Sequence, residues 1–225
     1  SVTVAANNAG SLNILGANNT VKVNEGATVA SLFASGNGST VTNDGTVTSL
    51  SLGGSGSVVA VNNGTLGTLG FGGVGIYTVD NNGTISHTQR DSNPTANEHT
   101  CSTIQAGTIT LNNRGTIEAI PNVNGIGSYA LLFYNGATVV ANAYNGSVVR
   151  SAGGYFIACG SADSVTLNIE NGAKFYSAGT EFVPTSSGKL VVQAMAPPVT
   201  YVAQIGETKY ASINAAFAAV NGQAG

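Results

Sequence analysis

The chain has 225 residues, of which 31 are glycine and 42% are apolar, whereas only 8% are charged and the net charge is −3. Charged residues make up about 25% of an ordinary globular domain, so small neutral side chains must form most of the surface. The weak negative charge excludes the basic surface that nucleic-acid binding requires. The apolar content excludes intrinsic disorder, and no apolar run is long enough for a membrane-spanning helix.

A repeated tripeptide, Asn-x-Gly, organises the first part of the chain. Its glycine falls at Gly26, Gly45, Gly64 and Gly83, nineteen residues apart each time. The β-branched and aliphatic residues on either side alternate as in half-buried strands. Asn and Gly accept the left-handed backbone that suits a sharp corner. Each unit is therefore predicted to be a strand, a corner and a strand.

A unit of about 19 residues cannot bury its own apolar face, so successive units must stack. We therefore predict an all-β fold over residues 1–195, a single-stranded parallel β-helix (solenoid) with coils of about 19 residues and the four glycines in one row. An antiparallel sandwich is the alternative, because it also contains many short strands and Asn-Gly turns. The residues expected to face inward are Leu50, Leu52, Leu66, Leu69, Phe71, Ile85, Ile117 and Ile120.

The regular spacing breaks between Gly83 and Gly115, where a polar loop is inserted near 86–100. Loops on a rigid scaffold commonly carry binding groups. A solvated loop without a binding role is the alternative. The spacing of the loop's polar residues matches no metal motif, so we predict no metal site and no cofactor. The candidate binding residues are His87, Arg90, Asp91, Glu98 and His99.

The two cysteines, Cys101 and Cys159, leave two interpretations open. They form one disulfide, as proteins of oxidising compartments do, or they are two small buried thiols. Neither cysteine belongs to a Cys-x-x-Cys motif or a Cys/His cluster, so zinc and redox chemistry are not indicated.

Most of the aromatic side chains follow the inserted loop, from Tyr129 and Phe133 to Phe175 and Tyr176. Aromatic side chains on an extended surface stack on sugar rings, and inside a solenoid they fill a wider coil or close its end. The sequence leaves both interpretations open.

The composition changes near residue 196, after which we expect a linker, a short strand and a helix over residues 196–225. Ser212 is the expected helix cap, with Ile213, Phe217 and Val220 on one face. This tail resembles the segment that opens many β-helix modules in large surface proteins of gut-type Gram-positive bacteria. The resemblance implies the start of a following module, and a cap on the last coil is the alternative.

The Asn-x-Gly-Thr-Ile units resemble the right-handed parallel β-helices of bacterial cell-surface proteins, including autotransporter-like adhesin passengers. This resemblance covers most of the chain. It implies a secreted or cell-surface protein with a structural or adhesive role, whose partner is a host glycan or a surface protein. The oligomeric state stays open.

A polysaccharide lyase or glycoside hydrolase is the alternative from the enzyme class. Such enzymes need clustered carboxylates, whereas the ten acidic residues of this chain are scattered and none are adjacent. Asp80 and Glu118 sit at comparable places in consecutive coils and could approach each other, but Asp80 precedes the corner and Glu118 follows it. We therefore predict no catalytic residues and a non-enzymatic function.

Overall fold

The computed structural model describes residues 1–90, 99–122, 129–153, 156–195, 203–205, 207–210 and 212–221. The chain divides into two compact units, Ser1–Met195 and Ala196–Gly225. Two of the candidate binding residues, Asp91 and Glu98, lie outside the described residues.

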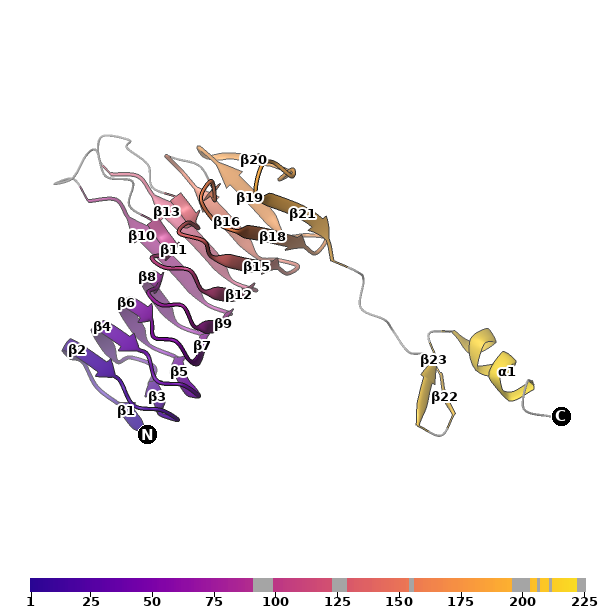
Figure 1. Ribbon diagram of the computed structural model, residues 1–225, viewed down its shortest axis with the longest axis horizontal. Coiled ribbons are helices and arrows are strands. Elements are labelled where there is room, and N and C mark those ends of the chain that lie inside the picture. Colours follow the sequence, from indigo (N-terminus) through magenta and orange to yellow (C-terminus); the bar gives the residue numbers. More distant parts are fainter. Residues whose placement is uncertain are drawn as a thin grey trace. The chain divides into compact units, whose positions relative to one another are not determined.

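The larger unit is a solenoid built from two sheets (Figure 1). Each coil contributes a strand to one sheet (sheet A), turns a corner and contributes the next strand to the other (sheet B). Neighbouring strands of sheet A are all parallel. Sheet B is parallel except where its last two strands, β19 and β20, form a hairpin. The predicted parallel β-helix is confirmed, and an antiparallel sandwich is wrong.

Each sheet follows the order of the coils. Sheet A consists of β1 (Val2–Val4), β3 (Thr20–Val23), β5 (Ser39–Asn43), β7 (Ser57–Asn62), β9 (Ile76–Asn81), β12 (Thr108–Asn113), β15 (Thr138–Ala143), β18 (Ser164–Ile169) and β21 (Leu190–Ala194). Sheet B consists of β2 (Asn8–Ile14), β4 (Thr28–Ala34), β6 (Thr46–Leu52), β8 (Thr65–Phe71), β10 (Thr84–Thr88), β11 (His99–Thr103), β13 (Thr116–Ile120), β14 (Tyr129–Leu132), β16 (Val148–Ser151), β17 (Ile157–Ala158), β19 (Lys174–Ser177) and β20 (Thr180–Phe182).

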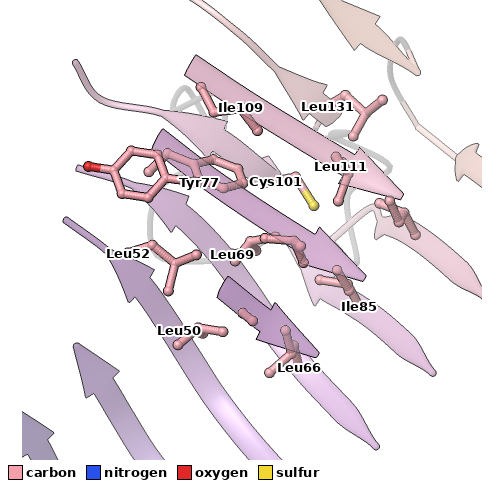
Figure 2. Packing of buried hydrophobic residues seen from close by; sticks show 14 of the residues in the cluster. Leu50, Leu52, Leu66, Leu69, Tyr77, Ile85, Cys101, Ile109, Leu111 and Leu131 are labelled. Atoms are coloured by element: carbon pink, nitrogen blue, oxygen red, sulfur yellow. The ribbon is translucent and has the colours of Figure 1, made fainter. Parts of the chain in front are cut away.

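The core lies between the two sheets, where aliphatic side chains from successive coils stack in files (Figure 2). One file runs through Val47, Leu66 and Ile85. The predicted inward residues are confirmed as buried, except for Ile120, which is half-buried at the end of β13. The Tyr77 ring is also fully buried, and its hydroxyl donates to the Gly54 carbonyl at 2.8 Å.

The 19-residue period holds only in the middle coils. Equivalent residues of β5, β7 and β9 are separated by 19 positions. The step from Asn81 to Asn113 is 32 positions, and later steps are 30, 26 and 25. The coils beyond β9 are therefore longer, although their strands keep the same pairing.

Corners of the short type contain two residues and end in Gly45, Gly64, Gly83 or Gly115. These glycines stack directly: a Cβ on Gly64 would lie 2.1 Å from the Gly45 carbonyl oxygen, and a Cβ on Gly83 would lie 2.1 Å from that of Gly64. Their backbones are outside the left-handed region. The expectation of left-handed corners is wrong here, because glycine is needed for the close approach of neighbouring coils.

Gly26 does not belong to this row, so that part of the sequence prediction is wrong. It lies in a longer corner, residues 24–27, with φ of +76°. Ala27 takes the place in the row, since its carbonyl oxygen would lie 2.5 Å from a Cβ on Gly45. Longer corners recur at Gly146 and Gly172, which also have positive φ. These are the positions where glycine provides a left-handed backbone.

A ladder of buried asparagines lines the short corners. Asn43, Asn62 and Asn81 each donate from Nδ2 to the Oδ1 of the next asparagine at 2.7–2.8 Å, and the last acceptor is Asn113. Each Nδ2 also donates to the carbonyl of a threonine just past the next corner, at 3.1–3.2 Å. The Oδ1 of Asn43 is buried without a hydrogen-bond partner, because β3 has Val23 at the equivalent place.

The smaller unit contains the antiparallel pair β22 (Ala203–Ile205) and β23 (Thr208–Tyr210), followed by α1 (Ile213–Asn221). Ser212 caps the helix as predicted, since its Oγ accepts from the Ala215 amide at 3.1 Å. Ile213, Phe217 and Val220 line one apolar hollow of this unit, as their shared face predicts.

Replacing Asn62 with alanine should lower the free energy of unfolding by about 3 kcal/mol, because it removes one of the two hydrogen bonds of the buried Asn43 Nδ2 and the bond that the buried Asn81 Oδ1 accepts from Asn62. The matched control is Asn142→Ala, which removes similar amide bonds from an outward-facing ladder and should cost less than about 1 kcal/mol. Urea unfolding of both variants measures the difference. Equal losses would contradict the structural role of the buried ladder.

Gly64→Ala should destabilise the fold by about 3 kcal/mol, because the added methyl group would collide with the backbone of the preceding coil. The control is Gly160→Ala, where a Cβ would meet nothing within 4 Å and the change should stay within about 0.5 kcal/mol. Thermal unfolding of the two proteins is the measurement, and an undisturbed Gly64→Ala protein would refute the close stacking.

Candidate functional site

In three successive coils, inserted chain divides the strand of sheet B in two at the same place. The unbroken strand β8 pairs with β10 through its first residues and with β11 through Leu69–Phe71. β10 and β11 together therefore occupy the position of one strand beside β8, and the chain between Thr88 and His99 is inserted between them. β13 and β14 continue this arrangement, as do β16 and β17. We call the strand ends on the two sides of these three insertions the insertion seam.

The described candidate residues lie on both sides of the first insertion. His87 is half-buried, pairs with Ala119 and shares the inward face of β10 with the buried Ile85. His99 begins β11 and pairs with Tyr129. Arg90 is exposed just beyond β10. Among the described residues, no three His, Cys, Asp or Glu side chains gather to hold a metal ion.

A row of polar side chains crosses the outer face of sheet B beside the insertion seam. Strand pairing places Ser86, Glu118, Arg150, Tyr176 and Glu181 next to one another in this order. We call these five residues the outer row. Glu118 and Arg150 form an ion pair, with 2.7 Å between Oε1 and Nε. The Tyr176 hydroxyl donates to Glu181 Oε2 at 3.2 Å.

The outer row borders a surface hollow of about 370 Å³. Small residues follow directly after the strands at this point: Ala152 after β16, and Gly179 in the turn after β19. The Gly179 amide donates to the Ser151 carbonyl at 3.2 Å, which holds the turn against β16. The hollow is lined by Glu118, Arg150, Ser151, Ala152, Tyr176 and Gly179.

Two other carboxylates terminate outward-facing amide ladders. Asp44 accepts from Asn63 and pairs with Lys22, with 3.3 Å between Oδ2 and Nζ. The hydrogen bond from Asn63 and the Lys22 ammonium group hold the pKa of Asp44 below its ordinary value. Asp80 accepts from Asn112 and lies 3.6 Å from Arg114. Both acids therefore have structural roles.

Asp80 and Glu118 do not form a catalytic pair. Asp80 belongs to β9 in sheet A, whereas Glu118 belongs to β13 in sheet B. Within the outer row, three strand positions separate Glu118 from Glu181, which is about 14 Å between backbones. Paired glycosidase carboxylates lie about 5–9.5 Å apart, so the backbone does not set up such a pair here.

The disulfide interpretation is wrong, because Cys101 and Cys159 are both free thiols. β14 lies between β11, which carries Cys101, and β17, which Cys159 follows. Two strand spacings are about 9.6 Å, more than the about 7 Å that a disulfide spans between Cα atoms. Burial raises the pKa of both thiols, most strongly at the fully buried Cys101.

The aromatic side chains divide between the two interpretations of the sequence. Phe156 packs on Phe175 and Phe182, with ring centroids 5.9 and 4.9 Å apart, and this cluster fills the core near the last coils. Tyr176, the neighbour of Phe175, instead lines the hollow. Among the described residues, Tyr176 is the aromatic side chain that lines this hollow.

The sequence singled out Glu118 only as a scattered acid and Tyr176 only as one of a run of aromatic residues, and it did not single out Arg150; nothing in it linked these three lining residues of the hollow. Their sequence separations are unequal because the coils differ in length. The usable signal is their common place after each corner: Glu118 is the third residue after Gly115, and Arg150 and Tyr176 are the third residues after Ser147 and Ala173.

Comparisons with protein-family models, with curated proteins and with solved structures return no match for this chain. Within the described residues, no helix has the length and apolar character needed to cross a membrane.

Iodoacetamide should label the native protein at Cys159 only, and slowly, because Cys159 is partly accessible and Cys101 is fully buried. Both cysteines should react after unfolding in guanidinium without a reductant. Mass spectrometry of the two samples measures the labelling. A denatured protein that takes up label only after reduction would show a disulfide and contradict the structure.

Proposed function

We propose that this chain is a non-enzymatic structural and adhesive module of a secreted or surface-attached bacterial protein, which presents the insertion seam to a host glycan or protein. The observation that carries the proposal is the opening of three successive coils at one place. A rigid solenoid that keeps its strand pairing on both sides of repeated insertions brings the flanking strand ends into one line, where loops on a scaffold commonly carry binding groups.

The roles of the acidic residues support a binding module over a polysaccharide-degrading enzyme. Asp44 and Asp80 terminate amide ladders, and Glu118 pairs with an arginine. Glu170 accepts from the Asn145 amide at 2.9 Å, and Glu181 accepts from Tyr176. Each of these carboxylates already has a hydrogen-bond or ion-pair partner within the chain.

Replacing residues 90–98 with a short Gly-Ser linker should leave the unfolding midpoint unchanged and weaken binding to host cells or glycan-coated surfaces by about tenfold. Leu15→Ser is the control, since Leu15 is 70% exposed in an N-terminal coil and its loss should not affect binding. Binding of the labelled full chain is measured by surface plasmon resonance and flow cytometry. Unaltered binding of the linker variant would show that the first insertion is not the contact.

The same protein should release no oligosaccharide from plant or host glycans, with or without calcium. Chromatography of the reaction mixtures tests this. Any released product that increases with protein concentration would establish the enzyme alternative and overturn the non-enzymatic assignment.

A further inference from the structure

The hollow beside the outer row combines three kinds of recognition group. Glu118 uses Oε1 for its ion pair with the Arg150 Nε, so Oε2 is an acceptor outside that contact. The Arg150 Nη groups are donors outside it, and the arginine side chain is 49% exposed. The Tyr176 ring forms part of the same lining. A donor, an acceptor and an aromatic surface thus meet in one small space.

We propose that this hollow binds one uncharged pyranose unit of a glycan. The proposal rests on the adhesive function proposed above and specifies the ligand and its site. A hollow of about 370 Å³ falls in the range of about 300–1,000 Å³ typical of small-molecule sites. The insertion seam then supplies surrounding contacts, while the sugar-binding groups are held on strands of sheet B.

Adjacent hydroxyl groups of a sugar match the Glu118–Arg150 pair. One hydroxyl donates to Glu118 Oε2 while its neighbour accepts from an Arg150 Nη, and both bonds are strengthened by the charge on the protein side. The ion pair also holds the two side chains in place before binding, which reduces the ordering cost. The Tyr176 ring covers an apolar C–H face of the same sugar.

Charge balance at the hollow favours an uncharged ligand. The carboxylate of Glu118 compensates Arg150 at 2.7 Å. The neighbouring strands β19 and β20 carry one further charge of each sign, Lys174 and Glu181. A uronate or sialate carboxylate would meet Glu118 without a surplus cation and would lose its hydration. The site therefore discriminates against acidic glycans.

The test measures binding of the full chain to neutral hexasaccharides of glucose and xylose and to hexagalacturonate, by calorimetry. The wild-type chain should bind a neutral hexasaccharide, and Tyr176→Ala should weaken that binding about tenfold. Tyr176→Phe keeps the ring and should stay within about threefold. The matched control is Tyr144→Ala, which removes a ring that lies 4.0 Å from Arg114 and does not line the hollow, so binding should not change.

Glu118→Ala tests the charge argument. It removes the acceptor and leaves Arg150 uncompensated, so neutral-sugar binding should fall about tenfold while hexagalacturonate binding should rise. Glu118 lies on the surface side of β13, and an unchanged unfolding midpoint checks the fold of each variant.

Preference of the wild-type chain for hexagalacturonate, or full binding by both Tyr176→Ala and Glu118→Ala, would overturn the proposal. If the 90–98 linker variant loses glycan binding and the hollow variants do not, the adhesive function stands and the hollow is the wrong site. If the chain binds host proteins and no glycan, the pyranose proposal fails and adhesion stands. If it binds neither, the proposed function itself fails.

Discussion

Backbone-to-backbone stacking at the short corners is the constraint on which the solenoid depends. Gly64 and Gly83 lie so close to the preceding coil that a Cβ on either would be 2.1 Å from a carbonyl oxygen of that coil. This contact fixes the register of one coil on the next. The buried asparagines reinforce it, because each one bonds both the next asparagine and the backbone beyond the next corner. Once the register is set in this way, the aliphatic side chains of successive coils lie above one another in files.

A coil fixed at its corner can vary in length elsewhere. β10 and β11 occupy the places of the first and second halves of β8, so the insertion between them interrupts no other pairing. The next two coils are divided in the same way: β13 and then β16 continue the sheet from β10, while β14 and then β17 continue it from β11. The insertion seam therefore arises because the two halves of β8 are continued by two separate series of strands, one that begins with β10 and one that begins with β11.

The sequence was sufficient to predict the parallel solenoid, its inward aliphatic residues and the capped helix after Ser212. It was misleading at Gly26, because a tripeptide with the right spacing belongs to a longer corner with a left-handed glycine. Whether Cys101 and Cys159 can form a disulfide depends on β14, which lies between β11 and β17, and the sequence does not show this strand order. The pairing of Glu118 with Arg150 depends on register across coils of unequal length, which no period in the sequence describes.

Stacking also explains why the chain needs few charges. Amide side chains in successive coils satisfy one another, so an outward ladder needs a charged acceptor only at its first position, as Asp44 and Asp80 provide. Each of these acids then acquires a nearby cation. Glu118 and Arg150 terminate no such ladder. Their ion pair, in which the Arg150 side chain is about half exposed, instead lies beside the hollow that we propose as the sugar site.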